Sequence, residues 1–262
     1  MKFFSCDTVL DEVFQKLWNG ADPFAEVEKL EGEVFRKVKT RKTFRIEVSG
    51  RGFFVKYHRG IGWKEIFKNL LQFKLPVLGA ANEFHALEKL HSIGVDTMTA
   101  AAYGRRMGID PSKQESFLIT EELKNMTSLE DVAKSGTGSE TRHKLIMKTA
   151  ASAGKMHRAG INHRDCYICH YLTDMDNFTS ASPVFVIDLH RAQIRKKVPY
   201  RYHVKDVAGL HFSSMDAGLS RLDRLRFIAV YCRFLPQCRR DRRFWKDVDK
   251  TAEKLYAKEH RK

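Results

Sequence analysis

The chain has 262 residues, a length that suits one large domain or two lobes. Hydrophobic residues make up 43% of it and aromatic residues 11%, so it can bury a core and is not a largely disordered chain. The 47 Lys and Arg residues exceed the 32 Asp and Glu residues and give a net charge of +15, which predicts an acidic partner.

Cysteine use and the N-terminal residues indicate a reducing compartment. The five cysteines are an odd number in a chain too long to need disulfide bridges. Residues 1–7 become acidic before a signal-peptide core could form. No apolar stretch approaches the ~18 consecutive residues of a membrane span. We therefore expect a cytoplasmic protein whose contact with a membrane is peripheral.

The first 123 residues alternate between helical and period-two patterns. Apolar residues near helical spacing predict an amphipathic helix over 7–30. The turn signal Ser49-Gly50-Arg51-Gly52 predicts a β-hairpin between two of the strands that follow. The expected strands cover about 32–39, 42–49, 52–58, 97–103 and 116–121, and the expected helices cover 62–74 and 80–93.

The remaining residues are mostly helical in pattern. Leu145, Thr149 and Met156 share a stripe of a long helix over 140–159, which Gly160 ends. The later elements are a polar loop at 161–169, a short strand near 170–173, an apolar strand at 183–188, and helix with a basic tail from about 201.

These patterns predict an α+β fold with two lobes. The first lobe, residues 1–123, would hold the N-terminal helix, a five-stranded antiparallel sheet and the helix that carries Glu83. The second lobe, residues 124–262, would be helical and would hold the polar loop and the basic tail.

Four side chains, in chain order Lys56, Glu83, Asp165 and Asp188, are of the types that phosphoryl transfer needs. A lysine on a strand can neutralise nucleotide phosphates, and a helical carboxylate can hold that lysine in place. An aspartate in a loop can accept the proton of the attacking hydroxyl. A second aspartate, at the end of a strand, can bind Mg²⁺.

This order resembles the protein-kinase-like fold. The amino-acid sequences of several segments are similar to those of the lipopolysaccharide core heptose(I) kinase family of Gram-negative bacteria. The similarity covers roughly residues 25 to 235. The segments that carry the resemblance are 79–86 (GAANEFHA), 90–97 (LHSIGVDT), 119–123 (ITEEL) and 161–170 (INHRDCYICH). The ordered set is more specific than the short motif His163-Arg164-Asp165 alone, because short motifs recur by chance.

The resemblance implies roles for the residues of the second lobe and an acceptor. Asp165 would be the catalytic base, in one motif with His163 and Arg164, and Asp188 would be the Mg²⁺ ligand. The family phosphorylates O-4 of the first heptose of the lipopolysaccharide inner core, with ATP as donor. His170 stands where a protein kinase has a second metal-binding residue, so it either helps to bind the metal or weakens that site.

The resemblance also implies a nucleotide site with one departure from protein kinases. Lys56 would bind the phosphates of ATP with Glu83 as its partner, and Glu121 to Leu123 would be the hinge that meets adenine. The Gly-rich phosphate loop is missing, and the segment Lys39-Thr40-Arg41-Lys42-Thr43 stands in its place. Arg41 and Lys42 would then cover the phosphates with their side chains.

Each of these residues has a simpler interpretation. Lys56 could protect an edge strand, Asp165 could be a turn residue, and Asp188 could cap a helix. Glu88 lies on the same predicted helix as Glu83 and is a rival partner for the lysine. A zinc site could instead be formed by His163, Cys166, Cys169 and His170.

The distribution of charge suggests the partners. Residues 36–74 hold 12 Lys and Arg against 2 acidic residues, interleaved with aromatic residues. This composition suits the lipopolysaccharide acceptor and the anionic inner face of the inner membrane. An acidic protein such as acyl carrier protein would also fit the charge. Nucleic acid would leave the ordered set of Lys56, Asp165 and Asp188 unexplained, so we expect none.

Two other functions remain open from the residues alone. The acceptor could be Kdo, a second heptose, an aminoglycoside or a protein hydroxyl. The chain could also be a non-catalytic, kinase-like adaptor for an acidic partner.

Overall fold

The computed structural model describes residues 5–38, 41–60, 62–63, 67, 79–107, 110, 112 and 114–260. The chain divides into two compact units. Unit 1 comprises Met1–Glu88 and Met98–Leu123, and unit 2 comprises Lys89–Thr97 and Lys124–Lys262. The chain thus passes into unit 2 after Leu123, but Lys89–Thr97, which the sequence analysis assigned to the first lobe, also groups with unit 2.

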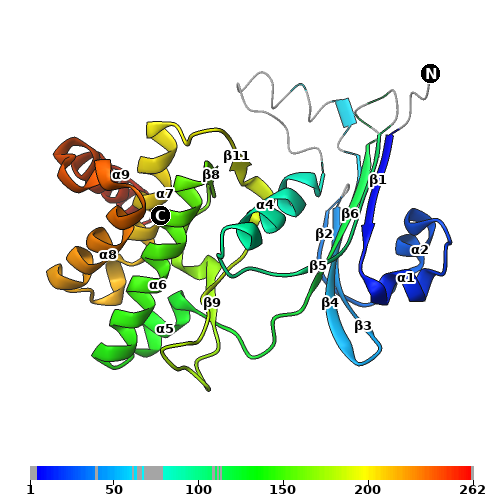
Figure 1. Cartoon of the computed structure of the whole chain (residues 1–262), viewed down its shortest axis with the longest axis horizontal. Helices are drawn as coiled ribbons and strands as arrows, with labels where there is room; N and C mark the ends of the chain where they lie inside the picture. Colours follow the sequence, from blue (N-terminus) through cyan, green and yellow to red (C-terminus); the bar gives the residue numbers. More distant parts are fainter. Residues whose placement is uncertain are drawn as a thin grey trace. The chain divides into compact units, whose positions relative to one another are not determined.

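Unit 1 is built on a six-stranded antiparallel sheet with strand order β1-β5-β6-β4-β3-β2 (Figure 1). The strands are β1 (Ser5–Leu10), β2 (Glu33–Val38), β3 (Arg41–Val48), β4 (Arg51–Arg59), β5 (Ala100–Met107) and β6 (Glu115–Glu121). The sequence analysis expected five strands and missed β1, which lies at the edge of the sheet and pairs with β5.

The N-terminal helix expected over 7–30 is wrong in its first part and broken in its middle. Its residues form β1 and two short helices, α1 (Glu12–Trp18) and α2 (Pro23–Lys29). The side chains of Asp11 and Asp22 accept hydrogen bonds from the first turns of α1 and α2, so each starts a new helix. Backbone pairing with β5 outweighs the helical spacing of the apolar residues in β1.

The hairpin between β3 and β4 forms as expected. Ser49 and Gly50 both have positive φ angles, of 52° and 74°, as the tight turns of two-residue hairpins require. The resulting register places Thr43 opposite Lys56 and Phe44 opposite Val55. Because side chains alternate between the faces of a sheet, Lys56 lies on the opposite face from the buried Phe44 and Val55.

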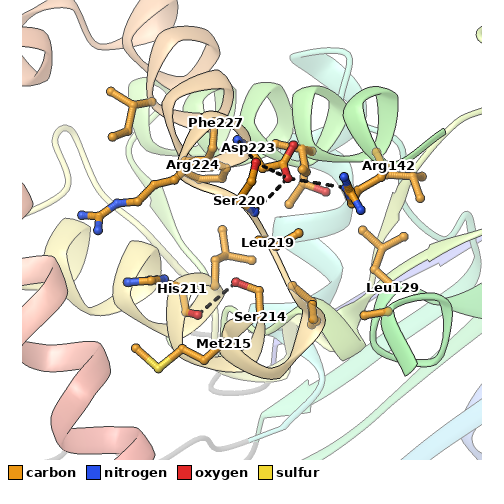
Figure 2. Close-up of a pocket in the computed structure, with 18 of the residues that line it drawn as sticks. Leu129, Arg142, His211, Ser214, Met215, Leu219, Ser220, Asp223, Arg224 and Phe227 are labelled. Atoms are coloured by element: carbon orange, nitrogen blue, oxygen red, sulfur yellow. Dashed lines mark hydrogen bonds and ion pairs between the residues drawn. The ribbon is translucent and has the colours of Figure 1, made fainter. Parts of the chain in front are cut away.

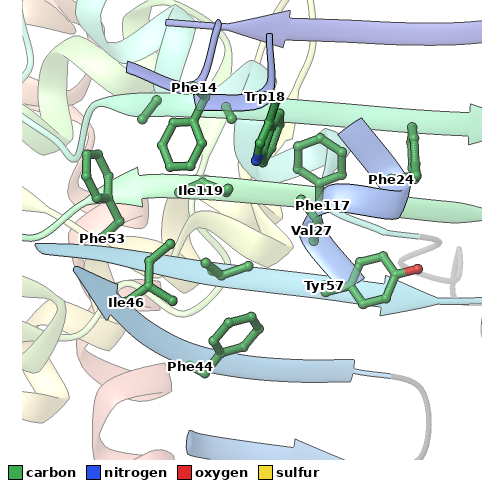
Figure 3. Packing of buried hydrophobic residues seen from close by; sticks show 13 residues of the cluster. Phe14, Trp18, Phe24, Val27, Phe44, Ile46, Phe53, Tyr57, Phe117 and Ile119 are labelled. Atoms are coloured by element: carbon green, nitrogen blue, oxygen red, sulfur yellow. The ribbon is translucent and has the colours of Figure 1, made fainter. Parts of the chain in front are cut away.

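Helices α1 and α2 cover the face of the sheet that carries Phe44, and an aromatic core fills the space between them (Figure 3). The ring of Phe117 on β6 meets those of Trp18 and Phe24 edge-on, with centroids 5.9 and 5.1 Å apart. Phe14 meets Phe53 in the same way at 5.2 Å. These contacts anchor both short helices to the sheet.

Helix α4 (Ala81–Ser92) packs on the other face and matches the helix expected over 80–93. Phe84 stacks on Tyr103 of β5, with ring centroids 4.0 Å apart. Phe84 and Leu87 are both buried, as the predicted apolar face of this helix requires. Glu83, next to Phe84, is therefore carried onto the same face of the sheet as Lys56.

Unit 2 is mostly helical, with α5 (Leu129–Ser135), α6 (Ser139–Arg158), α7 (Tyr200–Ser213), α8 (Arg221–Phe234) and α9 (Arg242–Glu259) (Figure 1). Short strands form two small sheets, β7 (Thr127–Ser128) with β9 (Tyr171–Thr173) and β10 (Phe185–Val186), and β8 (Ile161–Asn162) with β11 (Gln193–Ile194). Two 3₁₀ turns, η2 (Ile168–His170) and η3 (Leu189–Arg191), follow the polar loop and β10.

Gly160 ends α6 as the sequence predicted, and its conformation is required by the packing. Its φ of 81° is left-handed, and a Cβ at this position would lie 1.9 Å from the carbonyl oxygen of Arg195. The amide of Arg195 donates to the Gly160 carbonyl at 2.9 Å. The chain can therefore leave α6 and pair β8 with β11 only with glycine at this position.

The segment Lys89–Thr97 belongs to unit 2 because its last residues pair with β10. The amide of Val186 donates to the Asp96 carbonyl at 2.9 Å, and the Thr97 hydroxyl donates to the Val186 carbonyl.

Among the described residues, no helix combines the length and apolar content needed to span a bilayer. The basic helix expected over 62–74 lies largely outside the described residues.

Replacing Phe117 by Ala should lower the free energy of unfolding by about 3–5 kcal/mol, because the cavity lies under both N-terminal helices. Phe35→Ala is the matched control, since Phe35 is 58% exposed. Chemical denaturation of both variants measures the difference. Equal losses in the two variants would contradict the assignment of Phe117 to the core.

Candidate active site

Lys56 and Glu83 form a buried ion pair within unit 1. The Lys56 Nζ lies 2.5 Å from Glu83 Oε1, and the two side chains are 13% and 2% exposed. Glu88, the rival partner, is exposed. A lysine held in this way keeps its ammonium group at a fixed place beside the sheet, as phosphate binding requires.

The structure separates the two basic residues expected to cover the phosphates. Arg41 and Lys42 are neighbours on β3, so their side chains lie on opposite faces of the sheet. Lys42 stands 4.1 Å over the ring of Phe44, on the face that carries the aromatic core. Arg41 shares the face of Lys56, and its Nε is buried without a hydrogen-bond partner among the described residues.

Two of the three amides in the expected hinge are already engaged. The amide of Glu121 donates to the Thr99 carbonyl at 2.9 Å, and that of Glu122 donates to the Gly52 carbonyl at 3.0 Å. Neither of these N–H groups is free to meet adenine. Within the hinge, the backbone amide of Leu123 therefore remains the candidate for a hydrogen bond to adenine.

In unit 2 the His163-Arg164 backbone is held by Asp206 of α7. The Asp206 carboxylate accepts the amide of His163 at 2.6 Å and the amide of Arg164 at 2.9 Å. Arg164 has a φ of 75°, which is a strained conformation for a residue with a side chain. These two hydrogen bonds stabilise that conformation, so Asp206 sets the path of the loop into Asp165.

Asp206 is 1% exposed and carries a buried charge. Burial acts to raise the pKa of its carboxyl, but the contacts with His157 and His163 outweigh burial and lower it. The His157 ring lies between this carboxylate and the hydroxyl of Tyr231, at 3.3 and 2.7 Å. The sequence analysis missed Asp206, and a lone Asp in a helical stretch carries no local signal of this role.

The Asp165 carboxylate is paired with Arg191, a second residue that the sequence analysis missed. Arg191 Nη1 donates to both oxygens of Asp165, at 2.8 and 2.9 Å. The Asp165 side chain is 16% exposed and that of Arg191 is 37% exposed. Arg191 follows Asp188 by three positions and lies in η3, so this turn carries the arginine back to the loop.

Two histidines connect Asp165 to Asp188. The His170 Nδ1 donates to the Asp165 carbonyl at 2.7 Å, and its Nε2 lies 3.5 Å from Asp188 Oδ2. The buried His163 ring contacts the Ile187 carbonyl through Nε2 at 2.9 Å. The structure therefore brings together Asp165, Asp188, His163 and His170, as the sequence suggested, with His163 joining two backbone segments.

Asp188 has a left-handed backbone, with a φ of 60°, and its side chain is 35% exposed. His190 Nδ1 contacts its Oδ1 at 2.5 Å. Among the described residues, no group of three His, Cys, Asp or Glu side chains is arranged to hold a metal ion. One accessible carboxylate is nevertheless the donor set that Mg²⁺ uses when a nucleotide supplies most of the ligands, so Asp188 fits the metal that the fold implies.

The neighbours of His170 favour its protonated form. Burial acts to lower its pKa, but the Cys169 side chain, the Asp165 carbonyl and the Asp188 carboxylate outweigh burial and raise the pKa to about 9. A raised pKa favours the protonated ring, whose Nε2 lies 3.5 Å from Asp188 Oδ2. The alternative zinc site lacks support, because Cys166 is buried with its Sγ 3.3 Å from the Tyr171 hydroxyl.

A separate cavity of about 500 Å³ lies among the helices of unit 2 (Figure 2). Its walls are mostly apolar side chains such as Leu129, Leu145 and Phe227. The buried Asp223 at its border accepts hydrogen bonds from the Ser220 amide and hydroxyl. None of the site residues expected from the sequence lines this cavity.

A sheet unit with a lysine–glutamate pair and a helical unit with an aspartate pair are the two parts of a protein-kinase-like phosphotransferase. The sequence pattern of the lipopolysaccharide kinase (Kdo/WaaP) family matches residues 25–231. The chain belongs to this family, and both the α+β fold class and the family expected from the sequence are confirmed.

The relatives share most of their length with this chain. The lipopolysaccharide core heptose(I) kinase WaaP of Pseudomonas aeruginosa is 50% identical over 97% of each chain. The protein of the same name from Escherichia coli is 49% identical over 85% of this chain and 86% of its own. A solved structure of WaaP in complex with acyl carrier protein has a TM-score of 0.81 and 42% identity, and the match covers 95% of this chain and 99% of that one.

Replacing Asp206 by Asn should lower the free energy of unfolding by about 2–4 kcal/mol, because an amide cannot accept both backbone N–H groups as strongly as a carboxylate. Phosphotransferase activity should fall further than stability explains, measured at a temperature where the variant stays folded. Asp216→Asn, at an exposed carboxylate, is the control. A variant at Asp206 with wild-type stability and rate would refute the positioning role.

Proposed function

We propose that the protein transfers the γ-phosphate of ATP to O-4 of the first heptose of the lipopolysaccharide inner core. The observation that carries the proposal is the adjacency of Asp165 and Asp188 through His170, which is an arrangement suited to in-line transfer between a hydroxyl and a nucleotide. The names of the two WaaP relatives support a heptose of the core as the acceptor.

In this proposal Asp165 accepts the proton of the sugar hydroxyl. Arg191 holds both carboxylate oxygens in one orientation, so the base does not rotate away from the acceptor. His163 and Asp206 keep the loop backbone in place and do not touch the reacting atoms. The rate enhancement would come chiefly from positioning and from neutralisation of charge.

Residues of unit 1 would bind the nucleotide. Lys56, held by Glu83, would contact the phosphates, and Arg41 would cover them from the same face of the sheet. Among the amides of the hinge, Leu123 is our candidate for adenine. Mg²⁺ bound to Asp188 would neutralise charge on the phosphates of ATP.

The experiment is transfer of labelled γ-phosphate from ATP to purified core lipopolysaccharide, followed by location of the labelled hydroxyl. Asp165→Asn should lower the rate by about 10²–10⁴-fold, the usual contribution of a general base, in a variant that remains folded at the assay temperature. Asp216→Asn is again the control. A wild-type protein that labels no heptose would refute the function, whereas an active Asp165→Asn variant would refute only the base.

We also propose that the protein binds an acidic acyl carrier protein at the inner face of the inner membrane. The net charge of +15 complements an acidic protein and an anionic lipid surface. The solved relative was obtained as a complex with acyl carrier protein. The apolar cavity of unit 2 has the chemistry and the size to accept an acyl chain (Figure 2).

Ala133→Phe, which narrows this cavity, should weaken binding of an acylated carrier by about tenfold, because several buried methylene groups lose their contacts. Binding of the same carrier without its acyl chain should not change. Ala257→Phe, at an exposed site, is the matched control. Titrations in about 1 M salt, where screening removes purely electrostatic contacts, measure the specific part. Equal affinity for both carrier forms would refute the role of the cavity.

A further inference from the structure

Unit 2 has more arginines near the loop of Asp165 than the single Arg191 that pairs with the Asp165 carboxylate. Between Asp188 and Asp206 the sequence has six Lys and Arg residues and no Asp or Glu. Three of these arginines lie near the catalytic loop, and a fourth belongs to the loop itself. We call these four residues the arginine cluster: Arg164, Arg191, Arg195 and Arg201.

The members of the cluster are linked through shared contacts. Arg195 and Arg201 both stand over the ring of Tyr202, with their Cζ atoms 4.9 and 4.6 Å from its centroid. The Arg201 Nη2 also donates to the Tyr202 hydroxyl at 2.9 Å. Arg195 Nη1 donates to Asn162 Oδ1 at 2.6 Å, just ahead of the catalytic loop. Two guanidinium groups are thus gathered on one aromatic ring at the edge of the loop.

Arg164 has hydrogen-bonding capacity that the protein leaves unused. Its Nε is buried and has no hydrogen-bond partner within the described part of the chain. Burial lowers the pKa of Arg164 and the nearby charge of Arg191 lowers it further, while Tyr202 and Asp165 act to raise it. A buried donor among like charges is unfavourable unless an anion binds there.

The carboxylates near the cluster do not neutralise it. Asp165 is paired with Arg191, and Asp206 is occupied by two backbone amides and His157. Asp188 contacts His170 and His190. The cluster therefore retains a surplus of positive charge next to the candidate base.

We propose that the arginine cluster binds an anionic group, a carboxylate or a phosphate, of the acceptor saccharide and so places the acceptor hydroxyl against Asp165. The inference rests on the proposed function and specifies its substrate class as an acidic saccharide. Guanidinium groups present several N–H donors in a planar fork, which matches the two or three oxygens of such anions.

The position of the cluster favours the acceptor over the nucleotide. The Asp165 carbonyl is linked through His170 to Asp188, the residue proposed for the nucleotide. The Asp165 carboxylate is linked instead through Arg191 to the cluster. Asp165 thus connects Asp188 with the arginine cluster, as a base must when it stands between the phosphoryl donor and the acceptor.

Two variants test the proposal. Arg201→Gln removes one charge, and because Arg201 is exposed and contacts Tyr202 the variant should fold normally. Arg195→Lys keeps the charge but removes the planar fork. Arg233→Gln, at an exposed arginine of α8, is the matched control for net charge. Titration with inorganic phosphate measures anion binding, and steady-state kinetics gives separate KM values for ATP and for core lipopolysaccharide.

We expect Arg201→Gln and Arg195→Lys to weaken phosphate binding and to raise the acceptor KM by about tenfold, with the KM for ATP changed by less than about twofold. Unchanged phosphate affinity and acceptor KM in Arg201→Gln would overturn the proposal. A parallel rise in the KM for ATP would assign the cluster to the nucleotide and overturn it too. If the wild type labels no heptose, the proposed function fails, and loss of phosphate binding in the variants still supports an anion site.

Two treated acceptors identify the anionic group. One has its phosphates removed, and the other has its carboxylates reduced to alcohols. The wild-type KM should rise for one treated acceptor and stay constant for the other, and Arg201→Gln should no longer distinguish them. A wild-type KM that neither treatment changes would overturn the proposal.

Discussion

One buried carboxylate determines the shape of the loop that leads into Asp165. Asp206 accepts the amides of His163 and Arg164, and these bonds offset a left-handed backbone that costs on the order of 1–3 kcal/mol. Because Asp206 belongs to α7, the loop is positioned by a helix that begins at Tyr200, far along the chain. The side chains of the loop are therefore only as well placed as the packing of that helix allows.

The two faces of the sheet in unit 1 carry residues of different kinds. One face carries the aromatic core under α1 and α2. The other carries Lys56 and Glu83, beside the stacked pair of Phe84 and Tyr103. The alternation of side chains along a strand thus lets consecutive residues serve separate purposes. Lys56 is flanked by two residues of the buried face, Val55 and Tyr57, so its own orientation is fixed by their burial.

The sequence predicted those elements that are defined by patterns over a few neighbouring residues. The hairpin at Ser49-Gly50, helix α4 and the end of α6 at Gly160 follow from turn chemistry and apolar spacing. Strand β1 was missed because it is defined by pairing with β5, which lies far away in sequence. The pairing of Lys56 with Glu83 agrees with the motif order, whereas Asp206 and Arg191 act through tertiary contacts that no spacing reveals. The chemical roles of these residues stay predictions.

Gly160 has a consequence for the segment that we propose to bind the acceptor. Its missing side chain lets the Arg195 carbonyl approach closely, and the Arg195 amide donates to the Gly160 carbonyl, so the end of α6 and the start of the basic segment are held together. Any larger residue at position 160 would displace the backbone of Arg195 from the end of α6. Under the proposed function, substitutions that change only side chains in residues 195–201 would alter acceptor binding, while the glycine at position 160 keeps the Arg195 backbone in place.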